Sequence, residues 1–126
     1  MKTRLLAPLL LAGSVALVAC GGDGGSTEAT IPADAGLVVN AVEGLQWDRS
    51  EYTATAGDIV VVVENTSGQP HNLHFVAADN SQLPQVLDIP QRGSLAVDTV
   101  ALAAGTYTLI CTIPGHANMK ATLTVA

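Results

Sequence analysis

The sequence predicts an all-β protein, a Greek-key sandwich of two sheets with about seven strands. Three observations support this class. After residue 35 the chain is rich in Val, Thr and Ala, its apolar runs are short, and Gly, Pro, Asn and Asp separate them. No segment there carries an extended helical period. Several short strands divided by turn residues are typical of sandwiches and barrels.

The first 19 residues are predicted to be a secretory signal peptide. Lys2 and Arg4 give a positive start, and a mostly apolar run over residues 5–18 follows. That run is short for a membrane span, which needs about 20 apolar residues. It ends in Leu17-Val18-Ala19-Cys20, which resembles the lipobox of bacterial lipoproteins and implies lipid attachment at Cys20. The alternative is an ordinary signal peptide whose small residues happen to precede a cysteine.

Residues 20–35 are predicted to be a lipidated, flexible tether to a domain spanning residues 36–126. Four glycines lie between residues 21 and 30, and no apolar periodicity is visible there. A lipid on Cys20 would hold the protein at the bacterial cell envelope without a transmembrane helix. The expected location is the periplasm or the outer face of the membrane.

The net charge and the number of cysteines exclude some classes of function for the domain. Loss of the signal leaves three fixed cations against eleven acids, hence a net charge of −8 with His neutral. Nucleic acid is therefore not an expected partner. Once Cys20 carries lipid, Cys111 has no partner for an internal disulfide. Intermolecular pairing, a reactive thiol or a metal would explain it.

Seven strands are expected, and turn residues separate them. The strands cover residues 37–42, a looser 45–54, 59–64, 71–77, 94–102, 106–111 and 119–125. Turn residues occupy positions 56–58, 65–68, 103–105 and 114–115. The segment 60–63 is apolar on both faces and is expected to be a central strand.

Side chains alternate between the two faces of a strand, which places the chemically distinctive residues on buried faces. His71 is in phase with Leu73 and Phe75. In the strand that ends at Cys111, the in-phase residues are Tyr107, Leu109 and Cys111. In the last strand they are Met119, Ala121, Leu123 and Val125. Asn72 and His74 fall on the opposite face, so His74 is expected to be solvent-exposed and not a ligand. The aromatic residues expected to pack in the core or at its rim are Trp47, Tyr52, Phe75 and Tyr107.

The segment from Cys111 to Met119 carries a thiolate, an imidazole and a thioether within nine residues. Its Pro-Gly turn can bring Cys111, His116 and Met119 onto one ion, with His71 as a second imidazole from across the sandwich. Two imidazoles, one thiolate and a weak axial thioether form the ligand set of blue-copper electron-transfer sites. Taken singly, Cys111 would be a buried small hydrophobe, Met119 core filler and His71 a turn residue.

Two segments resemble the cupredoxins. Gly105-Thr106-Tyr107 through Cys111-Thr-Ile-Pro-Gly-His116 and Met119-Lys120-Ala121 is similar to the C-terminal strand-loop-strand of azurin. Glu64-Asn65 through Pro70-His71-Asn72-Leu73 is similar to the first-ligand segment of plastocyanin.

This resemblance implies a role for each matching residue. His71, Cys111 and His116 would be equatorial ligands of one copper ion, and Met119 the axial ligand. Asn72, together with Thr112, would tie the two ligand loops to each other. Pro70 matches the plastocyanin arrangement, which lacks the glycine carbonyl contact of azurin. Two residues separate His116 from Met119, one fewer than in azurin, which leaves the strength of the axial contact open.

The expected function is that of a type 1 blue copper protein, which carries single electrons without substrate turnover. Its expected partners are redox proteins of cytochrome or oxidase type, with the membrane contacted through the Cys20 lipid, and the protein is expected to be monomeric. Ile113, Pro114 and Ala117 are expected to form an apolar patch through which the His116 ring exchanges electrons.

Three other functions compete with electron transfer. A copper carrier for homeostasis or oxidase assembly is the alternative, because a ligand set does not reveal whether the electron or the ion is the cargo. Such sites are often rich in Met or His, however, and Met119 is the one methionine left after signal removal. A multicopper oxidase or nitrite reductase needs several domains and paired His-x-His motifs. A metal-free immunoglobulin-like module leaves the spacing of the ligands unexplained.

Overall fold

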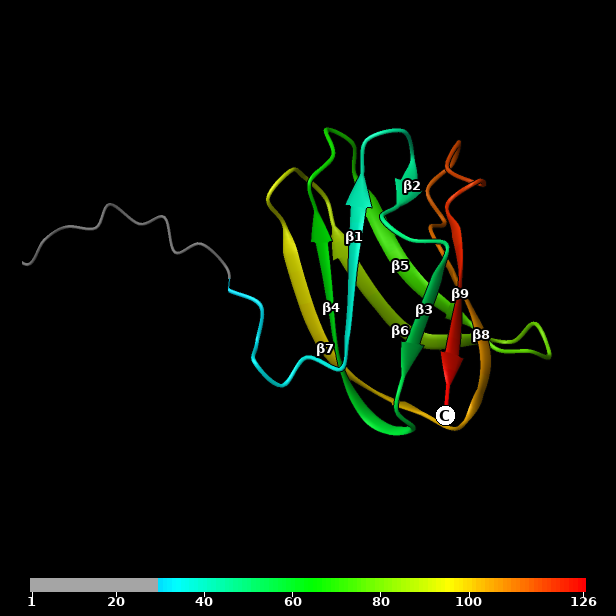
Figure 1. Ribbon diagram of the computed structural model, residues 1–126. Coiled ribbons are helices and arrows are strands. Elements are labelled where there is room, and N and C mark those ends of the chain that lie inside the picture. The colour runs from blue at the N-terminus through cyan, green and yellow to red at the C-terminus, as the bar shows by residue number, and fades with distance from the viewer. Residues whose placement is uncertain (1–29) are drawn as a thin grey trace, which may run out of the picture.

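The computed structural model describes residues 30–126, which form two β-sheets packed face to face (Figure 1). The predicted all-β sandwich is therefore confirmed. Within this range no helix is long and apolar enough to cross a membrane. The predicted signal peptide, Cys20 and most of the predicted tether lie outside the described residues.

The first sheet has the strand order β2-β1-β4-β7. Its strands are β1 (Leu37–Val42), β2 (Gln46–Trp47), β4 (Gly57–Asn65) and β7 (Leu95–Leu102). β1 runs parallel to β4, while its pairing with β2 and the β4–β7 pairing are antiparallel. The apolar segment 60–63 lies in β4, which has a neighbour on each side, so its predicted central position is confirmed.

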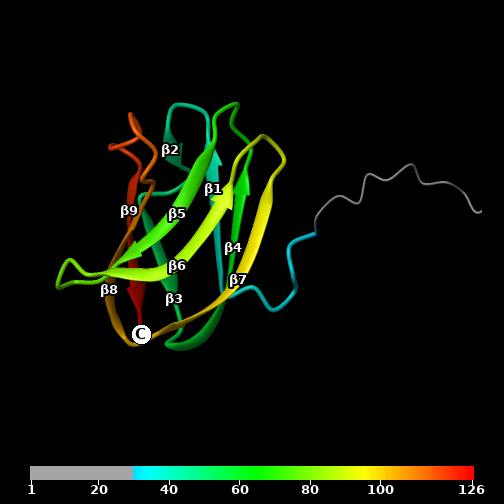
Figure 2. The same cartoon turned by 180° about the vertical axis from the view of Figure 1, so that it is seen from behind.

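The second sheet has the strand order β3-β9-β8-β5-β6. Its strands are β3 (Glu51–Ala54), β9 (Lys120–Val125), β8 (Gly105–Ile110), β5 (His71–Val76) and β6 (Gln82–Ile89). β3 is parallel to β9, and the remaining pairs are antiparallel. Figure 2 shows this sheet from the β5–β6 side.

Nine strands, not about seven, make up the described part of the chain. The expected single strand over residues 45–54 is wrong, because β2 and β3 belong to different sheets and residues 48–50 cross between them. β6 was not expected, since Pro84 and two glutamines interrupt its apolar pattern. Proline is tolerated there because β6 is an edge strand, where one side of the backbone needs no ladder partner.

The core lies between the sheets and follows the predicted alternation. His71, Leu73 and Phe75 point inward from β5 and are almost completely buried, while Asn72 and His74 lie on the outer face. The predicted inward faces that lead to Cys111 and away from Met119 are likewise buried, apart from the half-buried Tyr107. These parity predictions are confirmed.

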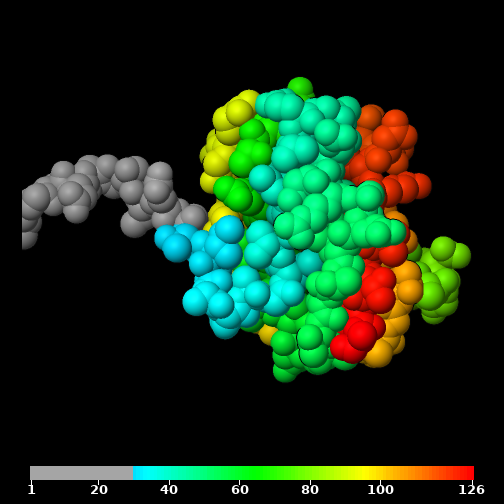
Figure 3. All heavy atoms as spheres, viewed as in Figure 1, coloured from blue at the N-terminus to red at the C-terminus, as the bar shows by residue number. Residues whose placement is uncertain are grey.

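Four chain connections gather at one end of the sandwich, which we call the loop end. They are residues 43–45, 66–70, 90–94 and 111–119, and they lie together at the top of Figure 1. The space-filling view shows the β1–β2 turn and the β8–β9 loop side by side there (Figure 3). Residues 30–36 join β1 at the opposite end. The topology therefore brings both predicted ligand segments to the loop end.

Candidate metal centre

Three buried side chains meet between the sheets at the loop end, those of His71, Cys111 and His116. Their ligand atoms all lie within 4.8 Å of one another, and Cys111 Sγ is 3.6 Å from His116 Nδ1. The two imidazole rings have centroids 5.0 Å apart and are inclined at 52°. At these separations one ion can contact a thiolate and two imidazoles at once.

The β8–β9 loop delivers two of these ligands because it folds back on itself within nine residues. Cys111 follows β8 directly and its N–H donates to the carbonyl of Met119, at 3.3 Å. Two short turns lie between them, closed by His116 N–H to Ile113 O at 3.0 Å and Met119 N–H to His116 O at 2.9 Å. Gly115 has φ = 89°, a conformation that costs other residues roughly 1–2 kcal/mol.

The orientation of His71 is set by a buried hydrogen-bond chain. Ser67 Oγ lies 2.7 Å from His71 Nε2 and 2.8 Å from Asn65 Oδ1. Because the hydroxyl donates its one hydrogen to the Asn65 oxygen, it accepts the Nε2–H of His71. The Asn65 amide is held in turn by the carbonyls of Gln69 and Ile89, at 2.7 and 3.0 Å.

This chain leaves His71 Nδ1 as a lone-pair nitrogen. It is buried and has no hydrogen-bond partner among the described residues, although buried polar atoms are nearly always paired. Burial, with a smaller effect from His116, lowers the pKa of His71 against an opposing effect of Glu43. A neutral imidazole with an unpaired nitrogen beside a free, buried Cys111 thiol fits a metal ion.

Asn72 and Thr112 connect the two ligand segments. Thr112 N–H donates to Asn72 Oδ1 at 2.8 Å, and Asn72 Nδ2 donates to Thr112 Oγ1 at 3.0 Å. Asn72 follows His71 and Thr112 follows Cys111, so each bond joins positions adjacent to a ligand. The predicted tie between the ligand loops is present.

Three residues that brace the loop end were not predicted from the sequence. Ser67 is one, and the others are Glu43 and Arg92, which form an ion pair across the loop end. Glu43 Oε1 also accepts from Gly68 N–H at 3.0 Å, and Arg92 donates to Thr66 O at 2.9 Å. The pair thus holds the loop that carries Ser67. No local pattern relates positions 43, 67 and 92, so only the folded topology reveals it.

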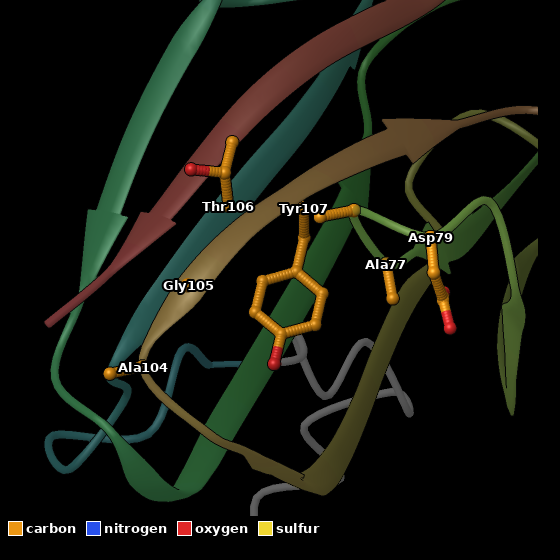
Figure 4. Close-up of a pocket in the computed structure, with 7 residues that line it drawn as sticks. Ala77, Asp79, Ala104, Gly105, Thr106 and Tyr107 are labelled. Atoms are coloured by element: carbon orange, nitrogen blue, oxygen red, sulfur yellow. The ribbon is translucent and has the colours of Figure 1, made fainter.

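A separate cavity, shown in Figure 4, lies beside Tyr107. It measures about 300 Å³ and is lined by residues 77–79 of the β5–β6 hairpin and residues 104–107 at the start of β8. Tyr107 donates its hydroxyl hydrogen to Ala103 O at 2.9 Å and stands four residues before Cys111, about 13 Å along the strand. The cavity therefore adds nothing to the ligand cluster.

Residues 34–126 match the family of copper-binding proteins of the plastocyanin/azurin type. The chain belongs to this family. The cupredoxin resemblance is thereby confirmed, and one copper ion is the metal that the His71–Cys111–His116 cluster suits.

Several solved structures are similar to this cupredoxin. Reduced auracyanin from the photosynthetic bacterium Roseiflexus castenholzii is 28% identical, with 71% of this chain and 95% of that chain covered and a TM-score of 0.62. A reduced amicyanin carrying one substitution is 26% identical, with 79% and 89% covered and a TM-score of 0.59. An azurin of Methylomonas sp. strain J shares the fold. It is 18% identical, with 75% of this chain and 99% of that chain covered and a TM-score of 0.58. The comparison with curated proteins found no match.

Met119 lies where an axial ligand would be expected, but its ligation stays a prediction. Its side chain is 1% exposed and it precedes β9 directly, in phase with Ala121 and Leu123. The backbone bond from Cys111 N–H to Met119 O brings the two residues side by side. Burial alone would also suit a core methionine, so substitution must separate the two roles.

We expect Met119→Leu to keep the blue colour of the copper-loaded protein and to raise its reduction potential. Loss of an electron-donating thioether destabilises Cu(II) more than Cu(I), and a tenfold shift in their ratio is about 60 mV for one electron. Voltammetry and the visible spectrum measure both quantities. Unchanged spectrum and potential would show that Met119 only packs in the core.

Proposed function

We propose that this cupredoxin carries single electrons between redox partners. The observation that supports this most directly is the buried His71–Cys111–His116 cluster braced from several strands. Bound copper would supply the one-electron change between Cu(I) and Cu(II). The residues around it hold one ligand geometry that serves both oxidation states, so little has to move when the electron passes.

The bracing favours electron transfer over copper delivery. A delivery protein must open its ligands to an acceptor, whereas here His71, Cys111 and His116 are 1%, 6% and 7% exposed. The Ser67 and Asn72 hydrogen bonds would both resist such opening. Copper delivery for homeostasis or oxidase assembly is the second candidate, and a rapid loss of copper to competing ligands would favour it.

The exposure of the two imidazoles indicates the route for the electron. His116 is more exposed than His71, which is almost completely buried. Pro114 and Ala117 beside it are exposed, and Ile113 is half-buried against the core. We assign His116 as the electron port, with Ile113, Pro114 and Ala117 as the surrounding apolar patch.

Charge at the loop end supports the same assignment. Its four connections contain two charged residues, Glu43 and Arg92, and these neutralise each other in their ion pair. The other acids among the described residues lie outside these four connections. An end with no net charge permits close and short-lived docking because few charges have to be desolvated on contact.

We further propose that the protein works as a monomer at the bacterial cell envelope, in the periplasm or on the outer face of the membrane. The lipobox-like Leu17-Val18-Ala19-Cys20 supports lipid attachment at Cys20. Partners of cytochrome or oxidase type suit a one-electron carrier that turns over no substrate.

The central test is the addition of one equivalent of Cu(II) to the purified protein. We expect an intense blue colour, because the Cys111 thiolate donates charge to Cu(II), and reversible reduction by one electron. Cys111→Ser should abolish the colour. A colourless product in which Cys111 is still a free thiol would overturn the proposal, and titration of the thiol checks that condition.

The port assignment is tested by introducing charge into the patch. Ala117→Glu or Ile113→Glu should slow the bimolecular electron exchange by about tenfold or more, because the new carboxylate must be desolvated on docking. The spectrum should barely change. Stopped-flow exchange with several partners measures this, and Thr106→Glu, exposed at the opposite end, is the matched control. Equal rates in patch and control variants would point to another route.

Anchoring should depend on Cys20. Cys20→Ser prevents lipid attachment, so we expect the cleaved or exported protein to leave the membrane fraction. Cell fractionation combined with mass spectrometry of the N-terminus measures location and processing together. A variant that is processed and still sediments with membranes would contradict the lipid anchor.

A further inference from the structure

His74 is engaged in a way that its sequence position did not suggest. It lies on the outer face of β5 as predicted, but it is half-buried and not freely exposed. Both of its ring nitrogens have partners: Nδ1 lies 2.8 Å from Gln82 Nε2, and Nε2 lies 3.1 Å from Thr112 Oγ1. We propose that His74 is a positioning residue for the copper site, acting through Thr112; this inference rests on the proposed function.

The donors and acceptors of this network can be assigned. The Gln82 amide nitrogen donates to Nδ1, so the hydrogen of the neutral ring is on Nε2 and is donated to Thr112 Oγ1. The same hydroxyl oxygen accepts from Asn72 Nδ2 at 3.0 Å. Thr112 is therefore held from two directions, by Asn72 beside one ligand and by His74 two strand positions further on.

A β-bulge brings Gln82 within reach of His74. His74 pairs with Val86, yet Val76 pairs with Gln82, so two residues of β5 are matched by four of β6. In a regular ladder Gln82 would stand opposite residue 78, about 13 Å along the strand from His74. The bulge moves it to the position diagonal to His74, about 7 Å away along the strand, which a glutamine side chain can span. Bulges commonly re-aim side chains in this way.

Thr112 is where this anchoring reaches the metal centre. Its N–H, bonded to Asn72 Oδ1, belongs to the peptide that leaves Cys111. Any rotation of that peptide displaces the Cys111 side chain relative to His71 and His116. His74 and Gln82 thus connect the Cys111 thiolate to the edge strand β6. No backbone pairing joins the ligand loop to β6, because β6 pairs only with β5.

The charged groups near His74 on this face are few. Asp88 lies on β6, opposite Asn72, and Lys120 on β9 lies opposite Ile110, which itself pairs with His74. Burial lowers the pKa of His74, and Asp88 opposes this effect. The ring is therefore neutral at pH 7.5, where the assigned donor pattern holds and where the following measurements are made.

The first measurement uses the copper-free protein, so it does not depend on the proposed function. Nitrogen-15 NMR should show His74 as the Nε2–H tautomer. In His74→Phe the Thr112 amide should exchange with solvent about fivefold faster, since one of its two anchors is lost. Val86→Ala, on the same face and opposite His74, is the matched control and should leave this exchange unchanged.

The second measurement uses the copper-loaded protein. His74→Phe should raise the Cu(I)-to-Cu(II) ratio at a given electrode potential about two- to fivefold, because a looser loop favours the less demanding Cu(I) state. His74→Gln, which keeps a donor, should shift it less and covers the case in which the Phe variant does not fold. In a Thr112→Val background the His74 substitution should add nothing further.

The outcomes separate the two claims. A wild-type protein that does not turn blue would contradict the proposed function. The amide-exchange measurement would still test the His74–Thr112 network. The inference is overturned if His74→Phe behaves as Val86→Ala does in both arms, or if its effect adds fully to that of Thr112→Val. Coupled effects of His74 and Thr112 on exchange and potential, with a silent Val86 control, establish His74 as a positioning residue.

Discussion

The hydrogen bond between His71 Nε2 and Ser67 Oγ decides what the loop end can do. It assigns the ring hydrogen to one nitrogen and leaves the other as a buried lone pair facing Cys111 and His116. Without this bond the ring could present either nitrogen, and the three donor atoms would not define one site. The Asn65 side chain, itself bonded to two carbonyls, keeps Ser67 in place. The ligand geometry is thus held by hydrogen bonds of the protein itself.

The remaining braces come from parts of the chain that are far apart in sequence. The Asn72–Thr112 bonds span 40 residues and the Glu43–Arg92 pair spans 49. An exposed ion pair contributes little stability on its own, about 0–1 kcal/mol. The Glu43–Arg92 pair instead fixes geometry. It joins two connections of the loop end to each other, and both side chains also bond to the backbone of a third connection, residues 66–70. A copper site braced in this way would change shape little on reduction, which suits the proposed electron transfer.

Local patterns in the sequence were sufficient for the fold class and the inward faces, because these depend on spacing within one strand. The meeting of His71 with Cys111 and His116 was predicted from the ligand set and the cupredoxin resemblance. Cys111 and His116 are joined by a Pro-Gly turn, and His71 shows its orientation through alternation. The edge strand β6 was not predictable, since Pro84 breaks its pattern and its pairing depends on a bulge. Ser67 and the Glu43–Arg92 pair were missed for a related reason: each acts across space between connections whose positions only the assembled sheets define.

The entry of the chain into β1 has a consequence for how the protein would stand in its surroundings. Residues 30–36 reach the sandwich at the end opposite His116, with the six-residue strands β1 and β9 running between the two ends. Six residues of strand extend about 20 Å. The copper site would therefore lie about that far from the point where the chain enters β1. Attachment through the N-terminal side would leave the loop end free to dock with a partner.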